Sequence, residues 1–191
     1  MLASASPRRR ELLALLGVAF TAKPADVDET PWPAEPALDY VIRVAEDKAN
    51  VAAERDPDAL VIAADTTVDL DGAILAKPTD EAEAERMLQA LSGRAHEVHT
   101  HVVVAHGAGG WGMAATVTTQ VLFDSLSDTD IAAYVATGEP MDKAGAYAIQ
   151  GGAAAFVRGV HGSVTNVVGL PLAELRELLR DAERRDRSAG S

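Results

Sequence analysis

The sequence predicts an α/β protein in which helices flank a mixed β-sheet. Segments with helical and strand-like patterns alternate along the 191 residues, and the strand-like segments are both short and long. This alternation favours a sheet with packed helices over an all-helical or all-strand architecture. Apolar residues make up 48% of the chain and charged residues 24%, as in ordinary globular domains.

The first helix has the clearest start signal. Ser6 is placed to cap it, and Pro7 follows at the first helical position, where a missing N–H group costs nothing. A stripe of leucines then runs to Gly17, which is expected to end the helix.

The other elements follow from apolar periodicity between turn and cap residues. Further helices are expected over 37–55, from Thr79 or Asp80 to Leu91, from Asp128 to about Thr137, and from Pro171 onward. Strands are expected over 60–64, 68–70, 74–76, 95–105, 111–123 and 154–160. The Asp71-Gly72 pair predicts a hairpin turn, and the charged and then small residues 183–191 predict a disordered tail.

Composition and charge exclude several classes of protein. The net charge of −12 disfavours non-specific binding to nucleic acid or to an anionic membrane. The lack of cysteine excludes disulfides and Cys-ligated metals. No apolar run approaches the roughly 18 residues that span a bilayer, and the first ten residues lack the apolar stretch of a signal peptide, so we expect a cytoplasmic protein.

The start of the first helix is a candidate site for an anion. Backbone N–H groups, the helix dipole and the hydroxyls of Ser4 and Ser6 would form a cradle there. Arg8 and Arg9 add forked donors that suit phosphate oxygens. The alternative is a capped surface helix with solvated arginines.

Acidic residues at two places are candidates for metal binding or for activating a water molecule. Asp65 and Thr66 follow the apolar run 60–64, so they are expected at the end of a buried strand, where ligands gather in α/β sheets. Glu29 ends the acidic segment 26–29, whose oxygens suit Mg²⁺ or Mn²⁺. The alternatives are a turn cap for Asp65 and a solvated loop for Glu29.

Two lysines and one glutamine complete the candidate polar groups. Lys48 falls beside the apolar side of the helix 37–55, and Lys77 is held in extended chain by the proline that follows it. Gln150 lies in the turn-rich segment 137–151, and its amide has both donor and acceptor edges, which suit the reading of a base. Each of the three alone is equally compatible with a solvated surface or a structural crossover.

Four of the five histidines fall within eleven residues, at His96, His99, His101 and His106. In a strand, His99 and His101 share one face and His96 lies on the other. No carboxylate stands at metalloprotease spacing, so a polar strand face is the preferred interpretation over a metal site.

Eight motifs in this order resemble the Maf family of nucleoside triphosphate pyrophosphatases, over Leu2 to about Leu179. They are Ser4-Ala-Ser-Pro-Arg-Arg9, Asp28-Glu29, Lys48-Ala49, Ala64-Asp-Thr66, Lys77-Pro78, Ser92-Gly93 with His96-Glu-Val98 and Thr100, Gly138–Gly151 and Asn166–Leu172. Only three residues precede Ser4, where the family has a longer first strand.

The resemblance implies an elongated fold with two lobes around a central cleft, a single domain over residues 1–182, and a homodimer. It also implies hydrolysis of a nucleoside triphosphate to the monophosphate and pyrophosphate with a divalent metal, Mg²⁺ or Mn²⁺. The amino-acid sequence of residues 138–151 is similar to that of the family branch that acts on dTTP and UTP. Modified pyrimidine triphosphates, such as 5-methyl-UTP or pseudo-UTP, are an alternative substrate class. A nucleotide-sensing regulatory protein linked to cell division or septum formation is an alternative function.

Carried over by position, the resemblance also implies roles for individual residues. Asp65 corresponds to the proposed proton acceptor, and Glu29 with Asp65 would hold the metal. Arg8, Thr66 and Gln150 correspond to positions of substrate selection. The remaining polar pocket would consist of Ser4, Arg9, Glu29, Lys48 and Lys77. Lys48 and Lys77 would act in catalysis, with Arg8 and Arg9, by neutralising the phosphates, and Ser6 would contribute to substrate binding.

Overall fold

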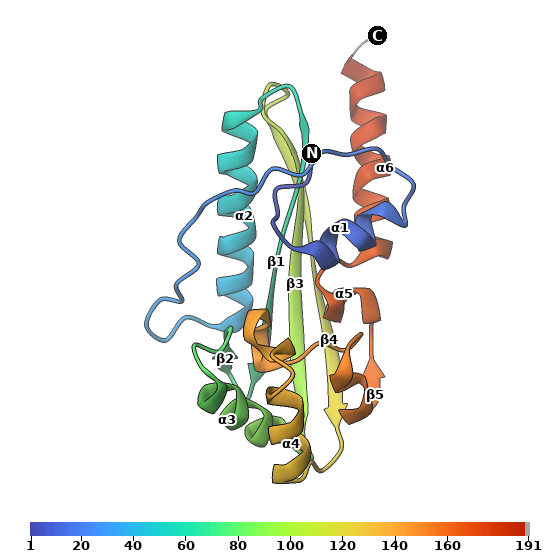
Figure 1. The fold of residues 1–191 in the computed structure, drawn as a ribbon. Coiled ribbons are helices and arrows are strands. Elements are labelled where there is room, and N and C mark those ends of the chain that lie inside the picture. Colours follow the sequence, from blue (N-terminus) through green and yellow to red (C-terminus); the bar gives the residue numbers. More distant parts are fainter. Residues whose placement is uncertain (190–191) are drawn as a thin grey trace.

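The computed structural model describes residues 1–189, and its centre is a long five-stranded sheet (Figure 1). The strands lie in the order β2-β1-β3-β4-β5, and every neighbouring pair of these five is antiparallel. Their bounds are β1 Leu60–Leu70, β2 Ala73–Leu75, β3 Ala95–His106, β4 Trp111–Phe123 and β5 Val157–His161. Parallel pairing is limited to isolated bridges from Leu2 to Ala22 and Ile62, so the expected mixed character of the sheet is confined to this short first segment.

Six α-helices and three short 3₁₀ helices surround the sheet in the described chain. The α-helices are α1 Pro7–Ala14, α2 Ala37–Arg55, α3 Glu81–Leu91, α4 Asp128–Val135, α5 Val164–Val168 and α6 Leu172–Ala189. The 3₁₀ helices are η1 Glu139–Asp142, η2 Ala144–Ala146 and η3 Gly152–Phe156. No helix among residues 1–189 has the length and apolar character needed to cross a bilayer.

The helices divide the molecule into two lobes along the sheet. In the upper lobe of Figure 1, α2 lies on one side of the long strands while α1 and α6 lie on the other. The alternating side chains of β1 supply both interfaces: Val61 and Ala63 pack in one core cluster with α2, and Ile62 and Ala64 pack in another with α1 and α6. The lower lobe contains α3 and α4.

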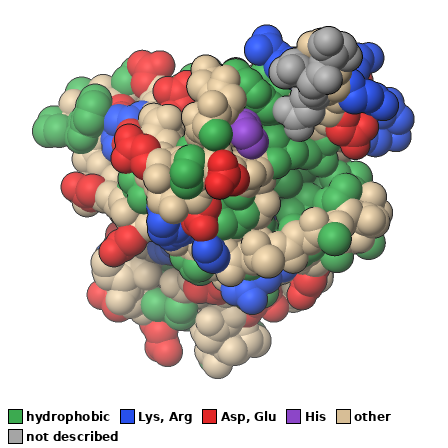
Figure 2. All heavy atoms as spheres, turned by 90° about the horizontal axis from the view of Figure 1, so that it is seen from above, with side chains coloured by type: hydrophobic (Ala, Val, Ile, Leu, Met, Phe, Trp, Pro, Cys, Tyr) green, Lys and Arg blue, Asp and Glu red, His purple; other side chains and the backbone are tan. Residues whose placement is uncertain are grey.

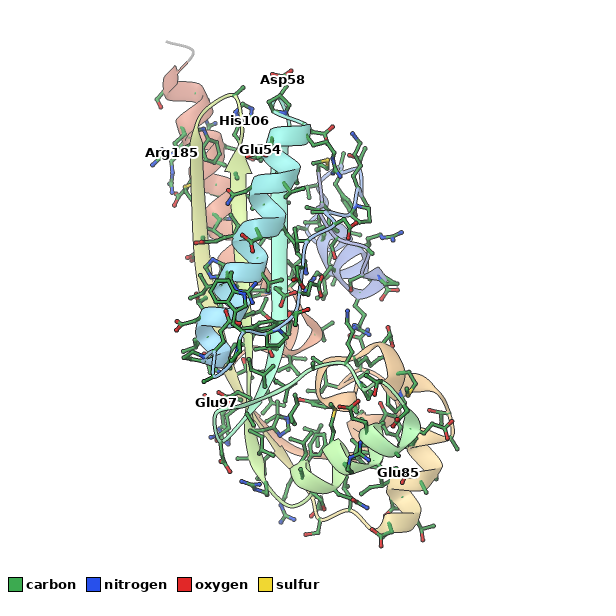
Figure 3. The ribbon with its side chains drawn as sticks, turned by 90° about the vertical axis from the view of Figure 1, so that its left-hand side faces the viewer. Glu54, Asp58, Glu85, Glu97, His106 and Arg185 are labelled. Carbon is green, nitrogen blue, oxygen red and sulfur yellow. The ribbon has the colours of Figure 1, made fainter. Side chains whose placement is uncertain are left out.

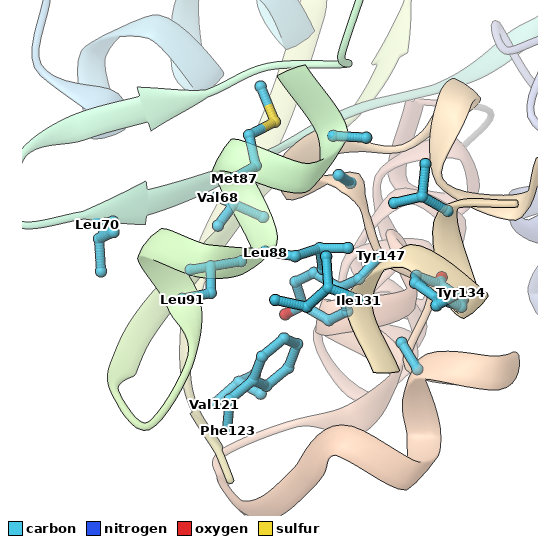
Figure 4. Close-up of a cluster of buried hydrophobic side chains, with 14 of the residues drawn as sticks. Val68, Leu70, Met87, Leu88, Leu91, Val121, Phe123, Ile131, Tyr134 and Tyr147 are labelled. Atoms are coloured by element: carbon cyan, nitrogen blue, oxygen red, sulfur yellow. The ribbon is translucent and has the colours of Figure 1, made fainter. Parts of the chain in front are cut away.

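The lower lobe has its own hydrophobic core (Figure 4). Leu88 and Leu91 of α3 pack with Ile131 of α4, and Phe123 at the end of β4 packs edge-on against Tyr147 with ring centroids 4.9 Å apart. The separate cores hold each lobe rigid, which leaves the boundary between them to polar groups.

The view from above in Figure 2 shows acidic and basic side chains interspersed around a hydrophobic region.

Several elements begin and end as the sequence predicts. Helix α2 spans 37–55 as expected, and Ser6 caps α1 by accepting a hydrogen bond from the backbone N–H of Arg9. Asp80 caps α3 in the same way. Helix α4 is capped by Ser127 rather than by Asp128, one residue earlier than expected, because the serine forms a reciprocal capping box with Asp130.

Several segments differ from the prediction. Helix α1 ends at Ala14, before Gly17, and the short helix α5 was not predicted. β1 does not end at Ala64 but continues through Asp65 and Thr66 to Leu70, so both polar residues lie within a strand and not at its end. The expected strand 154–160 begins only at Val157, after the turn η3. Helix α6 continues to Ala189 through most of the stretch expected to be a disordered tail, and residues 190–191 lie outside the described chain.

Candidate active site

A cavity of about 520 Å³ lies at the boundary of the two lobes, along an open edge of β1. Leu2 bridges to Ile62 above this edge, and β2 pairs with β1 only from Val68 onward. Between these two contacts β1 has no partner strand on this edge, and Asp65, Thr66 and Thr67 line the cavity there. The start of α1, the buried face of α2 and the segment 142–150 complete its lining.

The most buried charges in the cavity belong to Lys48 and Asp65. The Lys48 ammonium lies 2.8 Å from Asp65 Oδ1 and 2.6 Å from Glu29 Oε1, and the Lys48 and Asp65 side chains are each 8% exposed. Helix α2 buries Lys48 because it shares the apolar face of Val44 and Ala45. A buried ammonium requires counter-charges, so one lysine and two carboxylates form a compact, mutually held group.

Glu29 connects this group to the outside of the cavity. Burial alone would raise the pKa of Glu29, but the hydrogen bond and charge of Lys48, with the charges of Lys77 and Arg9, lower its pKa overall. The Lys77 ammonium lies 3.9 Å from Glu29 Oε2 and its side chain is 62% exposed, so it is free to move toward a ligand. The Tyr40 hydroxyl donates to the backbone carbonyl of Glu29 at 3.0 Å and fixes the loop.

Arg9 is a cation that the fold positions through neutral acceptors. Its guanidinium donates to the Gly169 carbonyl at 2.8 Å, to Thr66 Oγ1 at 3.0 Å and to Ser4 Oγ at 3.4 Å. Burial lowers the pKa of Arg9, and the charges of Asp65 and Glu29 act in the opposite direction. Since none of its bonds goes to a carboxylate, the positive charge is available to an anion in the cavity.

Thr66 connects Arg9 to the motif Asn166–Leu172 through hydrogen bonds. Thr66 Oγ1 lies 2.9 Å from Thr100 Oγ1, which donates to the Asn166 carbonyl at 3.0 Å. Gly169 has a φ of +119° and a Cβ there would lie 3.4 Å from Thr66 Oγ1, so a side chain at this position would be strained and would crowd the site.

Two side chains reach the cavity from opposite lobes. Arg8 of α1 forms an ion pair with Asp142 of η1, with 3.5 Å between Arg8 Nη1 and Asp142 Oδ2. Burial alone would raise the pKa of Asp142, but the neighbouring Lys143 and Arg8 lower it overall. Gln150 also lines the cavity and is exposed. The contact between Arg8 and Asp142 joins the two lobes across the cavity.

The carboxylate pair is the place in this cavity where a divalent cation fits. Lys48 contacts one oxygen each of Glu29 and Asp65, and the second oxygen of Glu29 faces only the exposed Lys77 ammonium at 3.9 Å, which can move away when an ion binds. Mg²⁺ in proteins is commonly held by one or two carboxylates together with substrate phosphates and water. The donor set therefore suits a hard cation that arrives with a phosphate ligand.

Comparison with known proteins identifies the family. A sequence model of the family described as Maf-like protein matches residues 1–182. The chain belongs to the Maf family. It is 57% identical over 184 residues to a protein of Anaeromyxobacter dehalogenans named dTTP/UTP pyrophosphatase, which covers 95% of this chain and 93% of that one. Proteins of the same name are 53% identical in Myxococcus xanthus (95% and 91% covered) and 52% identical in Geobacter sulfurreducens (94% and 94% covered).

All ten residues that the sequence singles out in this Maf-family chain line the one cavity. They are Ser4, Ser6, Arg8, Arg9, Glu29, Lys48, Asp65, Thr66, Lys77 and Gln150. Their individual roles stay predictions. Ser6 uses its hydroxyl to cap α1, so its contribution to a ligand would come mainly from the helix start that it stabilises. The sequence analysis missed Tyr40 and Asp142, and only the turn-rich composition of 137–151 gave a signal for the second.

Proposed function

We propose that this Maf-family protein hydrolyses dTTP and UTP to the nucleoside monophosphate and pyrophosphate. The observation that carries the proposal is the Lys48 ammonium held between Glu29 and Asp65 in the cavity beside Arg9 and Thr66. A buried carboxylate and lysine next to further cations suit the cleavage of a polyphosphate, and relatives more than half identical are named dTTP/UTP pyrophosphatase.

Cleavage between the α- and β-phosphates requires a water molecule in line with the α-phosphorus. Asp65 would take the proton of that water, and Lys48 fixes the orientation of its carboxylate through a 2.8 Å contact. Glu29 and Asp65 would hold Mg²⁺ or Mn²⁺, which would neutralise phosphate charge when bound. Glu29 and Asp65 would thus contact the metal and the Lys48 ammonium at the same time. The negative charge of a bound triphosphate would offset the repulsion between these two cations.

The leaving pyrophosphate requires relief of negative charge. Arg8, Arg9 and Lys77 line the cavity and would contact the phosphates, together with the N–H groups at the start of α1. The cavity is therefore suited to a triphosphate although the whole chain carries −12. Thr66 and Gln150 would select the base.

The direct test is a panel of nucleoside triphosphates with Mg²⁺ or Mn²⁺, scored for monophosphate, diphosphate, pyrophosphate and inorganic phosphate. We expect dTTP and UTP to yield monophosphate and pyrophosphate. Release of diphosphate and inorganic phosphate would contradict cleavage at the α–β bond. Tight binding of dTTP without any release would favour the alternative, a nucleotide-sensing regulatory protein. Including 5-methyl-UTP and pseudo-UTP tests modified pyrimidines in the same panel.

The remaining expectations concern the state of the protein in the cell. We propose a cytoplasmic homodimer of single-domain chains. The cavity is lined from one chain, so activity of a monomer would remain compatible with the catalytic proposal. Sedimentation equilibrium of the full chain tests the dimer.

A further inference from the structure

A second cluster of metal-ligating side chains lies where β1 and β3 pair, outside the cavity. Asp69 and Glu97 are directly opposite each other on the two strands, and His99 lies two residues further along β3. One ligand atom from each of the three residues lies within 4.8 Å of the other two. The described lining of the active-site cavity includes none of them.

The imidazole of His99 points a buried nitrogen at both carboxylates. His99 is 1% exposed, and its Nε2 lies 3.6 Å from Asp69 Oδ2 and 3.6 Å from Glu97 Oε2. These distances are too long for hydrogen bonds, and Nε2 has no hydrogen-bond partner among the described residues. A buried nitrogen without a partner is unfavourable unless another species occupies the space in front of it.

The opposite nitrogen of the ring is already held. His99 Nδ1 lies 2.8 Å from Thr118 Oγ1 on β4. When Nδ1 donates to this hydroxyl, the lone pair of the neutral ring is on Nε2, directed between Asp69 and Glu97. Metal-ligating histidines are commonly oriented through the second nitrogen in this way.

Asp69 is oriented by the hairpin that follows it. Its Oδ1 accepts a hydrogen bond from the backbone N–H of Gly72 at 2.6 Å, so Oδ2 is the oxygen that faces His99. The side chain of Glu97 is free to reorient toward an ion, because it is 51% exposed. Figure 3 shows Glu97 just below the first turn of α2, where an ion could enter from solvent.

The charges of the cluster favour a bound cation. Carboxylates directly opposite each other on neighbouring strands repel, and in the described part of the chain neither Asp69 nor Glu97 forms an ion pair with a lysine or arginine. Ligands of a tetrahedral ion with bonds of ~2.0–2.1 Å lie about 3.3 Å apart, close to the 3.6 Å separations here. An imidazole with carboxylates suits transition-metal dications better than Mg²⁺ or Ca²⁺.

We propose that Asp69, Glu97 and His99 form a second metal site that binds a transition-metal dication of the Zn²⁺ or Co²⁺ class. The site does not depend on the proposed function of the cavity. The bound ion joins β1 to β3 and stabilises the strand that carries Asp65 and Thr66. The spacing of residues within one strand does not predict this metal site, because Asp69 lies on β1 whereas Glu97 and His99 lie on β3.

The test uses the full chain, stripped of metal, and Co²⁺ as the probe. The background is the triple variant Glu29→Gln/Lys48→Met/Asp65→Asn, which removes the carboxylate pair of the cavity together with the buried lysine that the pair would otherwise leave uncompensated. We expect this background to bind one Co²⁺ per chain in equilibrium dialysis, with visible absorption bands of a four- or five-coordinate ion, and its Tm to rise with Co²⁺.

Site variants in the same background then locate the ion. Glu97→Gln and Asp69→Asn should each weaken Co²⁺ binding by about tenfold or more, and Asp69→Asn keeps an oxygen for Gly72. Thr118→Val should weaken it by about 10–100-fold, the usual effect of an outer hydrogen-bond partner. Glu54→Gln, an exposed carboxylate at the far end of α2, is the matched control and should change nothing.

Two results would overturn the proposal. The first is a background protein that binds no Co²⁺. The second is Co²⁺ binding that stays equally tight in Glu97→Gln and Asp69→Asn. Both results are independent of whether the wild-type protein hydrolyses dTTP, since the readouts are binding, absorption and Tm.

Discussion

Lys48 Nζ lies 2.8 Å from Asp65 Oδ1, and both side chains are almost completely buried. The two oppositely charged side chains are in contact, although they come from different layers of the fold, a helix and a central strand. Ion pairs of this kind contribute little net stability when compared with apolar replacements, but the loss of one partner leaves the other charge without compensation. This asymmetry makes the pair testable.

Lys48→Met should destabilise the protein by about 3–5 kcal/mol, because it leaves the buried Asp65 carboxylate unpaired. Lys48→Met/Asp65→Asn should recover much of that loss, since the uncompensated charge is removed as well. The measurement is the free energy of unfolding in urea for wild type, both single variants and the double variant. Additive effects of the two single changes would show that the contact carries no coupling.

Asp65→Asn should lower kcat for dTTP by about 10²–10⁴-fold, the usual contribution of a general base, with a smaller change in KM. Asparagine keeps the size of the side chain and an oxygen for Lys48, so the fold should be retained. Steady-state release of pyrophosphate gives the rate, and urea unfolding checks stability. Turnover within a few-fold of wild type would remove Asp65 from the chemistry.

Local signals in the sequence predict most of the helices and both long hairpin strands. Ser6 and Asp80 act as caps because their short polar side chains compete for free N–H groups at helix starts, and that effect is local. The site residues were predicted together because their motifs stand in a recognisable order. These residues line one cavity, and their roles stay predictions.

What local patterns could not predict depends on neighbouring strands and layers. Asp65 and Thr66 resemble a strand end, but they continue β1 because β3 pairs with them and because Lys48 and Arg9 form hydrogen bonds with their side chains. Residues 183–189 read as a tail from composition, whereas their glutamate and arginines are good helix formers that extend α6. The approach of Asp69 to His99 depends on the register between β1 and β3.

Gln150→Ala should change the order of preference among nucleoside triphosphates more than it changes kcat. Gln150 lines the cavity and is exposed, and its neutral amide offers donor and acceptor edges, so it suits the reading of a base rather than the movement of a proton. The measurement is kcat/KM for dTTP, UTP, dCTP and GTP with wild type and variant. If the ranking of the four substrates is unaltered, Gln150 does not read the base.

His96 should make the stability of the protein depend on pH between about 6.5 and 4. It is 3% exposed, its Nε2 lies 2.8 Å from the Tyr147 hydroxyl, and burial lowers its pKa from 6.5 to about 4. Below pH 6.5, His96 takes up a proton in the unfolded chain but stays neutral in the folded chain. The contribution of His96 to the free energy of unfolding is therefore complete above pH 6.5 and is lost as the pH falls toward 4. The full effect is about 3 kcal/mol.

The matched variant for this titration is His96→Gln, whose amide can keep a hydrogen bond to Tyr147 but does not titrate. Carboxylates elsewhere lose stability in acid too, so the decisive quantity is the difference in free energy of unfolding between wild type and variant, measured from pH 7.5 to pH 4.5. We expect wild type to lose about 2–3 kcal/mol more than the variant over this range. A constant difference would mean that His96 takes up its proton equally in both states, and the absence of a partner for its buried Nδ1 among the described residues makes that outcome unfavourable.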